Sequence, residues 1–169
     1  MAGATSGSYL TFTLDKELYA VNVSRVREVL ESTRITRLPN TAEYMKGIIN
    51  LRGSSVPVID LKMKFGLSAT AESGKASIVV MELESAGEMI VVGALADDVH
   101  EVIEISADKI DPAPRFGTRL AATYIQGLAR RGEDFVVILD VDRVFSDDET
   151  GELAAVAAAP STAAAGAPA

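Results

Sequence analysis

Hydrophobic residues recur along this chain in short runs, many of them with a period of two, which is the pattern of half-buried β-strands. Leu10, Phe12 and Leu14 alternate with threonines, and a turn at 15–17 leads into a second apolar run at 18–21. The pattern predicts a mainly β protein built of short strands and hairpins. The other predicted strands lie at 26–31, 48–51, 56–61, 78–83, 89–95, 99–104, 124–128 and 135–139.

The hairpin predicted at 47–61 contains polar residues that its apolar strands do not explain. Its turn lies at 52–55, and Pro57, which lacks a backbone N–H donor, predicts an edge or bulge position for the second strand. Asn50 and Arg52 stand beside positions that are otherwise typical of a core. Because an unpaired buried charge is strongly destabilising, we expect the Arg52 guanidinium to reach water or a carboxylate.

Glu28 is the candidate carboxylate. In a strand at 26–31, Val26, Glu28 and Leu30 share one face, which we expect to point inward or toward a cleft. An ion pair between Glu28 and Arg52 would satisfy both groups. Such a pair can be purely structural or part of a binding groove, and the third alternative is that water solvates both side chains.

Short helical turns and polar segments connect the predicted strands. Asn22 is placed to cap a turn at 23–25, Thr41 to cap a short helix at 42–46, and Asp140 to cap a helix that ends near 145. Residues 68–74 resemble a polar linker. The segment 147–169 is rich in alanine and proline, and we expect it to be a disordered tail.

The predicted elements repeat once along the chain. The segment 26–31 recurs as 99–104, and the Arg52-Gly53 turn with its following apolar strand and aspartate recurs at 131–140. Each copy is too small to form a generous core alone. The repeat therefore predicts two packed five-stranded β-barrel subdomains with short helices.

Composition excludes several classes of partner and site. The 169-residue chain has a formal net charge of −8, which disfavours phosphate backbones and anionic lipid, so we expect neither nucleic acid nor direct membrane insertion. It contains no cysteine, hence no disulfide or thiolate metal site, and a cytosolic setting is permitted. The first eight residues are small and polar, so they predict a flexible N-terminus rather than a signal peptide.

The residues that could carry catalysis do not form a recognisable constellation. His100 is the only histidine and has no serine or cysteine partner nearby in sequence, and no glycine-rich phosphate loop is present. Asp97, Asp98 and Glu101 leave open a small barrel that binds or hydrolyses a ligand, although Asp98 is as well explained as a helix cap. We expect no catalytic residue, no metal and no cofactor.

Several motifs resemble those of the CheW-like family of bacterial chemotaxis coupling proteins. The most specific is Asn-Leu-Arg-Gly at 50–53 followed by Val-Pro-Val-Ile-Asp-Leu at 56–61. The resemblance extends from Tyr9 to Phe145. Two departures are Asn22, where many members have proline, and the alanine-rich tail. The other matching positions are 19–23, 26–29, 46–49, 65–66, Gly93, 98–99, 101–102 and 112–114.

The resemblance implies a non-catalytic adaptor made of two intertwined five-stranded barrels. Members of the family bridge the regulatory domain of the histidine kinase CheA and the cytoplasmic tip of chemoreceptors, so we expect a cytoplasmic protein recruited to membrane-associated receptor arrays. The resemblance also implies that Glu28 and Arg52 pair. The receptor-binding groove that it implies consists of Val26, Glu28, Gly47, Asn50, Arg52, Gly93, Val99 and Val102.

The expected domain organisation is one CheW-like domain at 9–146, preceded by the flexible segment 1–8 and followed by the tail. Its subdomains are expected at about 9–74 and 75–146, with exchange of strands between them allowed. An alternative that the sequence leaves open is a CheW-like scaffold in another chemosensory pathway, such as twitching motility or a cyclic-nucleotide output.

Overall fold

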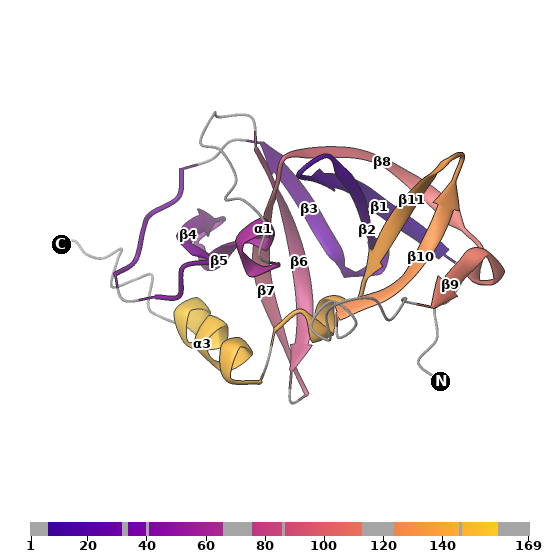
Figure 1. Ribbon diagram of the computed structural model, residues 1–169. Helices are drawn as coiled ribbons and strands as arrows, with labels where there is room; N and C mark the ends of the chain where they lie inside the picture. Colours follow the sequence, from indigo (N-terminus) through magenta and orange to yellow (C-terminus); the bar gives the residue numbers. More distant parts are fainter. Residues whose placement is uncertain are drawn as a thin grey trace.

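The computed structural model describes residues 7–31, 34–39, 41–65, 76–85, 87–112, 124–145 and 147–158. The chain forms two antiparallel-rich sheets, one of six strands and one of five, with only short helical segments between them (Figure 1). The mainly β class predicted from the hydrophobic pattern is confirmed. Figure 1 shows β9, β10 and β11 at one end of the molecule and β4 and β5 at the other.

The six-stranded sheet has the order β8-β1-β2-β11-β10-β9. Its pairs are antiparallel except that β2 and β11 run parallel. The strands are β1 (Gly7–Leu14), β2 (Glu17–Asn22), β8 (Asp98–Ile105), β9 (Ile110–Pro112), β10 (Ile125–Arg131) and β11 (Asp134–Leu139).

The five-stranded sheet has the order β3-β6-β7-β5-β4. Its one parallel pair joins β5 to β7, which repeats the arrangement of β11 and β2 in the other sheet. The strands are β3 (Val26–Glu31), β4 (Met45–Leu51), β5 (Ser54–Asp60), β6 (Ser77–Ser85) and β7 (Glu88–Ala96).

Each sheet takes strands from both halves of the chain. The β1–β2 hairpin is followed by β3, which crosses to pair with β6, and the β6–β7 hairpin is followed by β8, which crosses back to pair with β1. The boundary expected near residue 74 therefore does not separate the two sheets. The strand β3, before the boundary, pairs with β6 after it, and β8, after the boundary, pairs with β1 before it. The repeat detected in the sequence, 26–31 and 99–104, corresponds to these two crossing strands.

Aspartate and asparagine side chains cap three of the short helices, as expected for Asn22 and Asp140 but not predicted for Asp60. Asn22 Oδ1 accepts from the Ser24 backbone N–H at 2.9 Å at the start of the helix η1 (Val23–Arg25). Asp60 and Asp140 make the same contact with the residue two positions on, at α1 (Leu61–Lys64) and η3 (Val141–Arg143). A third turn, η2 (Ala107–Lys109), links β8 to β9.

The largest hydrophobic cluster lies where the two sheets meet. It draws buried residues from β1 and β2 of one sheet and from β6 and β7 of the other, including Phe12, Val21, Leu83 and Val92. Smaller clusters fill each sheet separately, around Val136 in the six-stranded sheet and Val58 in the five-stranded one. Because the main cluster is shared, neither sheet holds its principal core alone.

Three expectations about local structure are wrong. Gly7 and Ser8 are not a flexible end but the first residues of β1, paired with β8; residues 1–6 lie outside the described residues. Residues 42–44 form a turn rather than a helix, and Met45 already begins β4. Pro57 does not lie at an edge, because β5 is flanked by β4 and β7, although pairing with β7 begins only at Val58.

The expected disordered tail is also wrong for its first part. Residues Asp147–Ala158 form the helix α3, and Leu153 is fully buried in the main cluster. Alanine, leucine and glutamate are strong helix formers, and Leu153, with Ala154 and Val156 partly buried beside it, packs the helix against the core. Residues 159–169, and the linker expected at 68–74, lie outside the described residues.

Candidate partner-binding groove

The turn between β4 and β5 places Arg52 at the tip of a tight hairpin. Leu51 pairs with Ser54, leaving a two-residue loop in which Arg52 and Gly53 both have positive φ, of 52° and 89°. This is the geometry of a type I′ turn, whose twist matches that of the strands. Asn50 Oδ1 accepts from the Gly53 N–H at 2.8 Å, so the Asn50 side chain stabilises the turn.

The guanidinium of Arg52 binds Glu28 of β3 through two hydrogen bonds. Arg52 Nη1 lies 2.5 Å from Glu28 Oε2, and Nη2 lies 3.1 Å from Oε1. The Arg52 side chain is 74% exposed whereas that of Glu28 is 25% exposed, so the arginine reaches from solvent onto a partly covered carboxylate. This is the ion pair expected from the sequence, and it joins the edge strand β3 to the β4–β5 hairpin.

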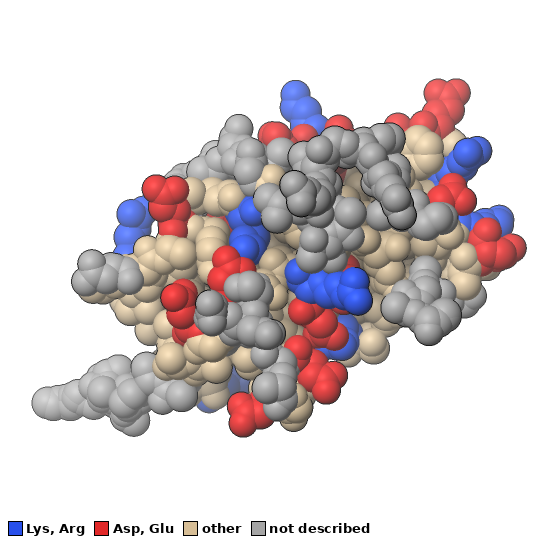
Figure 2. All heavy atoms as spheres, turned by 60° about the horizontal axis from the view of Figure 1, so that its bottom comes forward, with Lys and Arg blue, Asp and Glu red and all other residues tan. Residues whose placement is uncertain are grey.

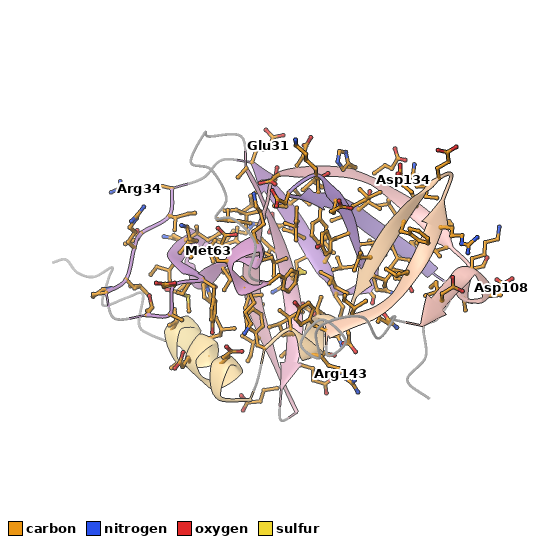
Figure 3. The ribbon with its side chains drawn as sticks, viewed as in Figure 1. Glu31, Arg34, Met63, Asp108, Asp134 and Arg143 are labelled. Atoms are coloured by element: carbon orange, nitrogen blue, oxygen red, sulfur yellow. The ribbon has the colours of Figure 1, made fainter. Side chains whose placement is uncertain are left out.

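The pair shifts the titration of both partners. The hydrogen bond from Arg52 holds the pKa of the Glu28 carboxyl below its ordinary value of 4.5, and the hydrogen bond to Glu28 raises the pKa of Arg52. Glu31, three residues along the same strand, points away from the sheet into solvent (Figure 3). Glu28, by contrast, lies against the β4–β5 hairpin, where Arg52 binds it.

A groove of about 740 Å³ lies beside this ion pair. The Arg52 hairpin and β3 form two of its sides, and β7 contributes the exposed Met89, whose surface is 54% accessible. The groove thus combines apolar surface with a charged rim, which is the composition of a protein docking site. Its lining residues are Arg27, Glu28, Leu51, Arg52, Ser54, Ser55, Val56, Glu88, Met89, Ile90, Val91 and Ala154.

The two glycines predicted for the groove are buried and serve packing. A Cβ at Gly47, where φ is 148°, would lie 2.1 Å from the Thr36 carbonyl oxygen. A Cβ at Gly93 would lie 2.7 Å from Ile78 Cγ2. Both positions therefore require glycine because neighbouring chain segments approach closely, and neither lines the groove.

The three predicted valines lie on the crossing strands. Val26 of β3 and Val99 of β8 are half-buried against the main cluster, whereas Val102 is 50% exposed. Val99 and Val102 belong to the six-stranded sheet, and none of the three lines the groove at Arg52. Of the eight predicted residues, Glu28 and Arg52 line the groove together and Asn50 supports their turn.

A second ion pair occupies the equivalent place in the other sheet. Arg131, at the end of β10, donates through Nη2 to Glu101 Oε2 of β8 at 2.5 Å, and this hydrogen bond lowers the pKa of Glu101. Glu101 follows Glu28 by the repeat offset, and Arg131-Gly132 repeats Arg52-Gly53. The internal repeat is the sequence signal for this pair, because it places Glu101 and Arg131 at the positions equivalent to Glu28 and Arg52. A smaller groove of about 270 Å³ lies beside it.

Two of the three carboxylates of the ligand-binding alternative have structural partners. Asp97 accepts from Lys62 Nζ at 3.1 and 3.2 Å and from the Asp15 backbone N–H at 2.8 Å. Asp98 is an exposed residue of β8 rather than a helix cap, and Glu101 binds Arg131. His100 contacts the Thr13 hydroxyl at 2.5 Å. Asp97, His100 and Glu101 are therefore engaged in contacts between elements of the fold.

Two properties of the described segments bear on other kinds of site. In them, no three histidine, cysteine, aspartate or glutamate side chains lie close enough together to hold a metal ion. No helix among the described residues has the length and apolar character needed to span a membrane. On the face in Figure 2, acidic and basic side chains are interspersed with neutral ones rather than gathered by sign.

Comparison with known proteins identifies related sequences and a related structure. A family model described as the CheW-like domain matches residues 8–149. The chain is 35% identical over 150 residues to chemotaxis protein CheW of Klebsiella aerogenes, with 88% of each chain covered. It is 32% identical over 149 residues to chemotaxis protein CheW of Treponema pallidum, covering 86% of this chain and 85% of that protein.

The related structure is the crystal structure of the scaffolding protein TtCheW from Thermoanaerobacter tengcongensis. It matches with a TM-score of 0.73 and 33% sequence identity, over 84% of this chain and 94% of that one. The two-sheet architecture is therefore shared with a protein of known structure.

Proposed function

Because this chain belongs to the CheW-like domain family, we propose that it couples chemoreceptors to the histidine kinase CheA. The related proteins are chemotaxis proteins, and the solved neighbour is a scaffolding protein. Membership of this family gives the chain a non-catalytic scaffold role in chemotaxis. The partners proposed are the regulatory domain of CheA and the cytoplasmic tip of a chemoreceptor, which implies a cytoplasmic protein recruited to receptor arrays.

The observation that carries the proposal is the Glu28–Arg52 pair at the rim of a half-apolar groove. A guanidinium has five N–H donors, and Glu28 accepts from two of them. An incoming segment with apolar side chains can pack against Met89, while an acceptor on its flank receives a hydrogen bond from Arg52. Such a rim contact sets register and specificity more than affinity.

We propose that the receptor tip contacts Glu28 and Arg52 directly, with Val26, Val99 and Val102 contributing through the crossing strands. Gly47, Asn50 and Gly93 are assigned to the support of this surface, since the two glycines are buried and Asn50 holds the turn. Individual contacts of this kind are modest in strength. In an array, many copies bound at once raise the overall avidity.

The test is a titration of the purified full chain. It is titrated first with the CheA regulatory domain of the same organism and then with a soluble receptor tip fragment, by isothermal calorimetry. Micromolar binding to the kinase domain, with kinase activity that rises only when chain and receptor are both present, is the expected result. A folded chain that binds no CheA would instead favour a scaffold in another chemosensory pathway.

A matched pair of variants tests the site. Arg52→Ala removes the groove arginine, and Arg131→Ala removes its equivalent in the other sheet. We expect Arg52→Ala to weaken binding of the tip fragment by about tenfold, as truncation of an interface arginine does, and Arg131→Ala to leave it unchanged. Equal effects of the two variants would place the tip elsewhere.

A further inference from the structure

The helix α3 packs against β5 and β7 (Figure 1). Its residue Ala154 lines the groove. Leu153 is fully buried in the main cluster, and Ala154 and Val156 are partly buried against it. Successive residues of a helix are turned by about 100°. Leu153 therefore faces the core, Ala154 faces the groove that it lines, and Ala155 is exposed.

An ion pair holds the first turn of α3 in this position. Lys64 Nζ, at the end of α1, lies 2.7 Å from both carboxylate oxygens of Glu149, and the two side chains are only 17% and 27% exposed. The same ammonium lies 4.9 Å from the centre of the Tyr44 ring. Burial and the neighbouring Glu149, to which it is hydrogen-bonded, raise the pKa of Tyr44 to about 12.

The match to the family model ends at residue 149, before the part of α3 that touches the groove. Ala154 lines the same groove as the Glu28–Arg52 pair, Met89 and Ile90. The groove thus has a wall formed by residues beyond the matched domain. Its floor is apolar at Met89, which is exposed, and the wall presents the methyl group of Ala154.

We propose that α3 is a wall of the partner-binding groove, and that the receptor segment in contact with Arg52 also packs against Ala154 and Met89. This inference rests on the proposed function. The occupant is a helical segment with an apolar side chain facing the floor and a carboxylate or carbonyl facing Arg52, because these groups complement the methyl, the thioether and the guanidinium that the groove presents.

Methyl NMR of the wild-type chain tests the proposal without altering the groove. The chain is labelled with ¹³C at alanine and methionine methyl groups, and the soluble receptor tip fragment is added in steps. We expect the Ala154 and Met89 signals to shift and the Ala155 signal to stay in place. Assignments come from Ala154→Ser and Ala155→Ser.

A pair of substitutions gives an independent measurement. Ala154→Arg places a long charged side chain in the groove, and Ala155→Arg places the same side chain one position along, on the exposed face of the helix. We expect Ala154→Arg to weaken tip binding by about tenfold or more and Ala155→Arg to leave it unchanged. Thermal melts of both variants show whether the fold is retained.

The outcomes separate this inference from the proposed function. If the tip fragment binds and the Met89 methyl signal shifts while the Ala154 signal does not, the partner uses the groove but α3 is not its wall. If the tip binds and neither methyl shifts, the partner docks elsewhere and the groove assignment fails as well. If wild-type chain binds no tip fragment at all, the proposed function fails, and this inference with it.

Discussion

The Glu28–Arg52 pair shows how one exposed interaction is held in place by its surroundings. Arg52 is in a left-handed conformation that is unfavourable for a residue with a Cβ, by about 1 kcal/mol. The turn nevertheless places the guanidinium on the Glu28 carboxylate with two hydrogen bonds. A residue that accepts an unfavourable conformation and remains largely exposed is typical of binding sites.

Removing Arg52 should change the titration of Glu28 more than the stability of the fold. We expect Arg52→Ala to raise the Glu28 pKa toward 4.5, because the hydrogen bond that favours the carboxylate is lost. Carboxyl ¹³C titration by NMR measures this, and Arg131→Ala should move Glu101 instead. A sharp fall in melting temperature, matched by Glu28→Ala, would show that the pair is mainly structural.

The same pKa direction determines how the pair contributes to stability at different pH. Because the pKa of Glu28 is lower in the folded than in the unfolded chain, the unfolded chain binds more protons between the two values. The contribution is therefore present above pH 4.5 and is lost as the pH falls through the folded value. In urea melts, wild type and Glu28→Gln should converge in stability at low pH.

Gly47 and Gly53 provide a contrast between packing and conformation. A Cβ at Gly47 would meet the Thr36 carbonyl oxygen at 2.1 Å, whereas at Gly53 it would meet nothing within 4 Å. We expect Gly47→Ala to lower the free energy of unfolding by about 3 kcal/mol and Gly53→Ala by about 1 kcal/mol, measured by urea denaturation. Similar losses would mean that the Thr36 segment moves aside easily.

At the scale of elements, ion pairs hold both crossing strands where they leave their hairpins. Arg25, just before β3, binds Asp142 of η3, and Asp97, just before β8, binds Lys62 of α1. Asp142 and Lys62 occupy equivalent places, two residues after the capping Asp140 and Asp60. Both crossing strands are therefore held near their start by an ion pair to a capping turn, and the signs of the two charges are reversed between the pairs.

Asp97 is expected to matter because its partner is buried. The Lys62 side chain is only 7% exposed, so Asp97→Ala would leave an ammonium without its carboxylate. We expect a loss of about 3 kcal/mol in the free energy of unfolding, and a smaller loss when Lys62→Met is added, because the unpaired charge is then removed. A double variant less stable than Asp97→Ala would contradict this account.

The helix α3 is expected to depend on one leucine. Leu153 lies in the main cluster, and 0% of its surface is accessible to solvent. We expect Leu153→Ala to lower the free energy of unfolding by about 3 kcal/mol, and the more conservative Leu153→Met to lower it by less than about 1.5 kcal/mol. If Leu153→Ala is neutral in urea melts, the helix contributes little to the fold.

At the scale of the whole molecule, the strand exchange makes the two halves interdependent. The main cluster combines β1 and β2 from the first half with β6 and β7 from the second, and each sheet combines strands of both halves. We expect fragments 1–75 and 76–169 to be unfolded alone and to form native structure when mixed. Circular dichroism and NMR of each fragment measure this, and an independently folded half would contradict it.

Periodicity and turn chemistry in the sequence were sufficient for the local elements. They predicted the strands other than β9, the hairpin at Arg52, the caps at Asn22 and Asp140, and the internal repeat, because each depends on residues close together in the chain. The Glu28–Arg52 pair was also predicted, since an arginine beside apolar strands needs a partner and the face of Glu28 is determined by strand alternation.

Only the tertiary structure determined which strands pair and what orders the weaker segments. Alternation in β3 and β8 is the same whichever sheet they join, so the exchange of strands could not be derived from it. The helix α3 has too few apolar residues to predict burial, and its order depends on a distant Lys64 and a shared core. The groove has the same origin: Glu28, Arg52, Met89 and Ala154 come together because long-range packing, rather than local pattern, determines their positions.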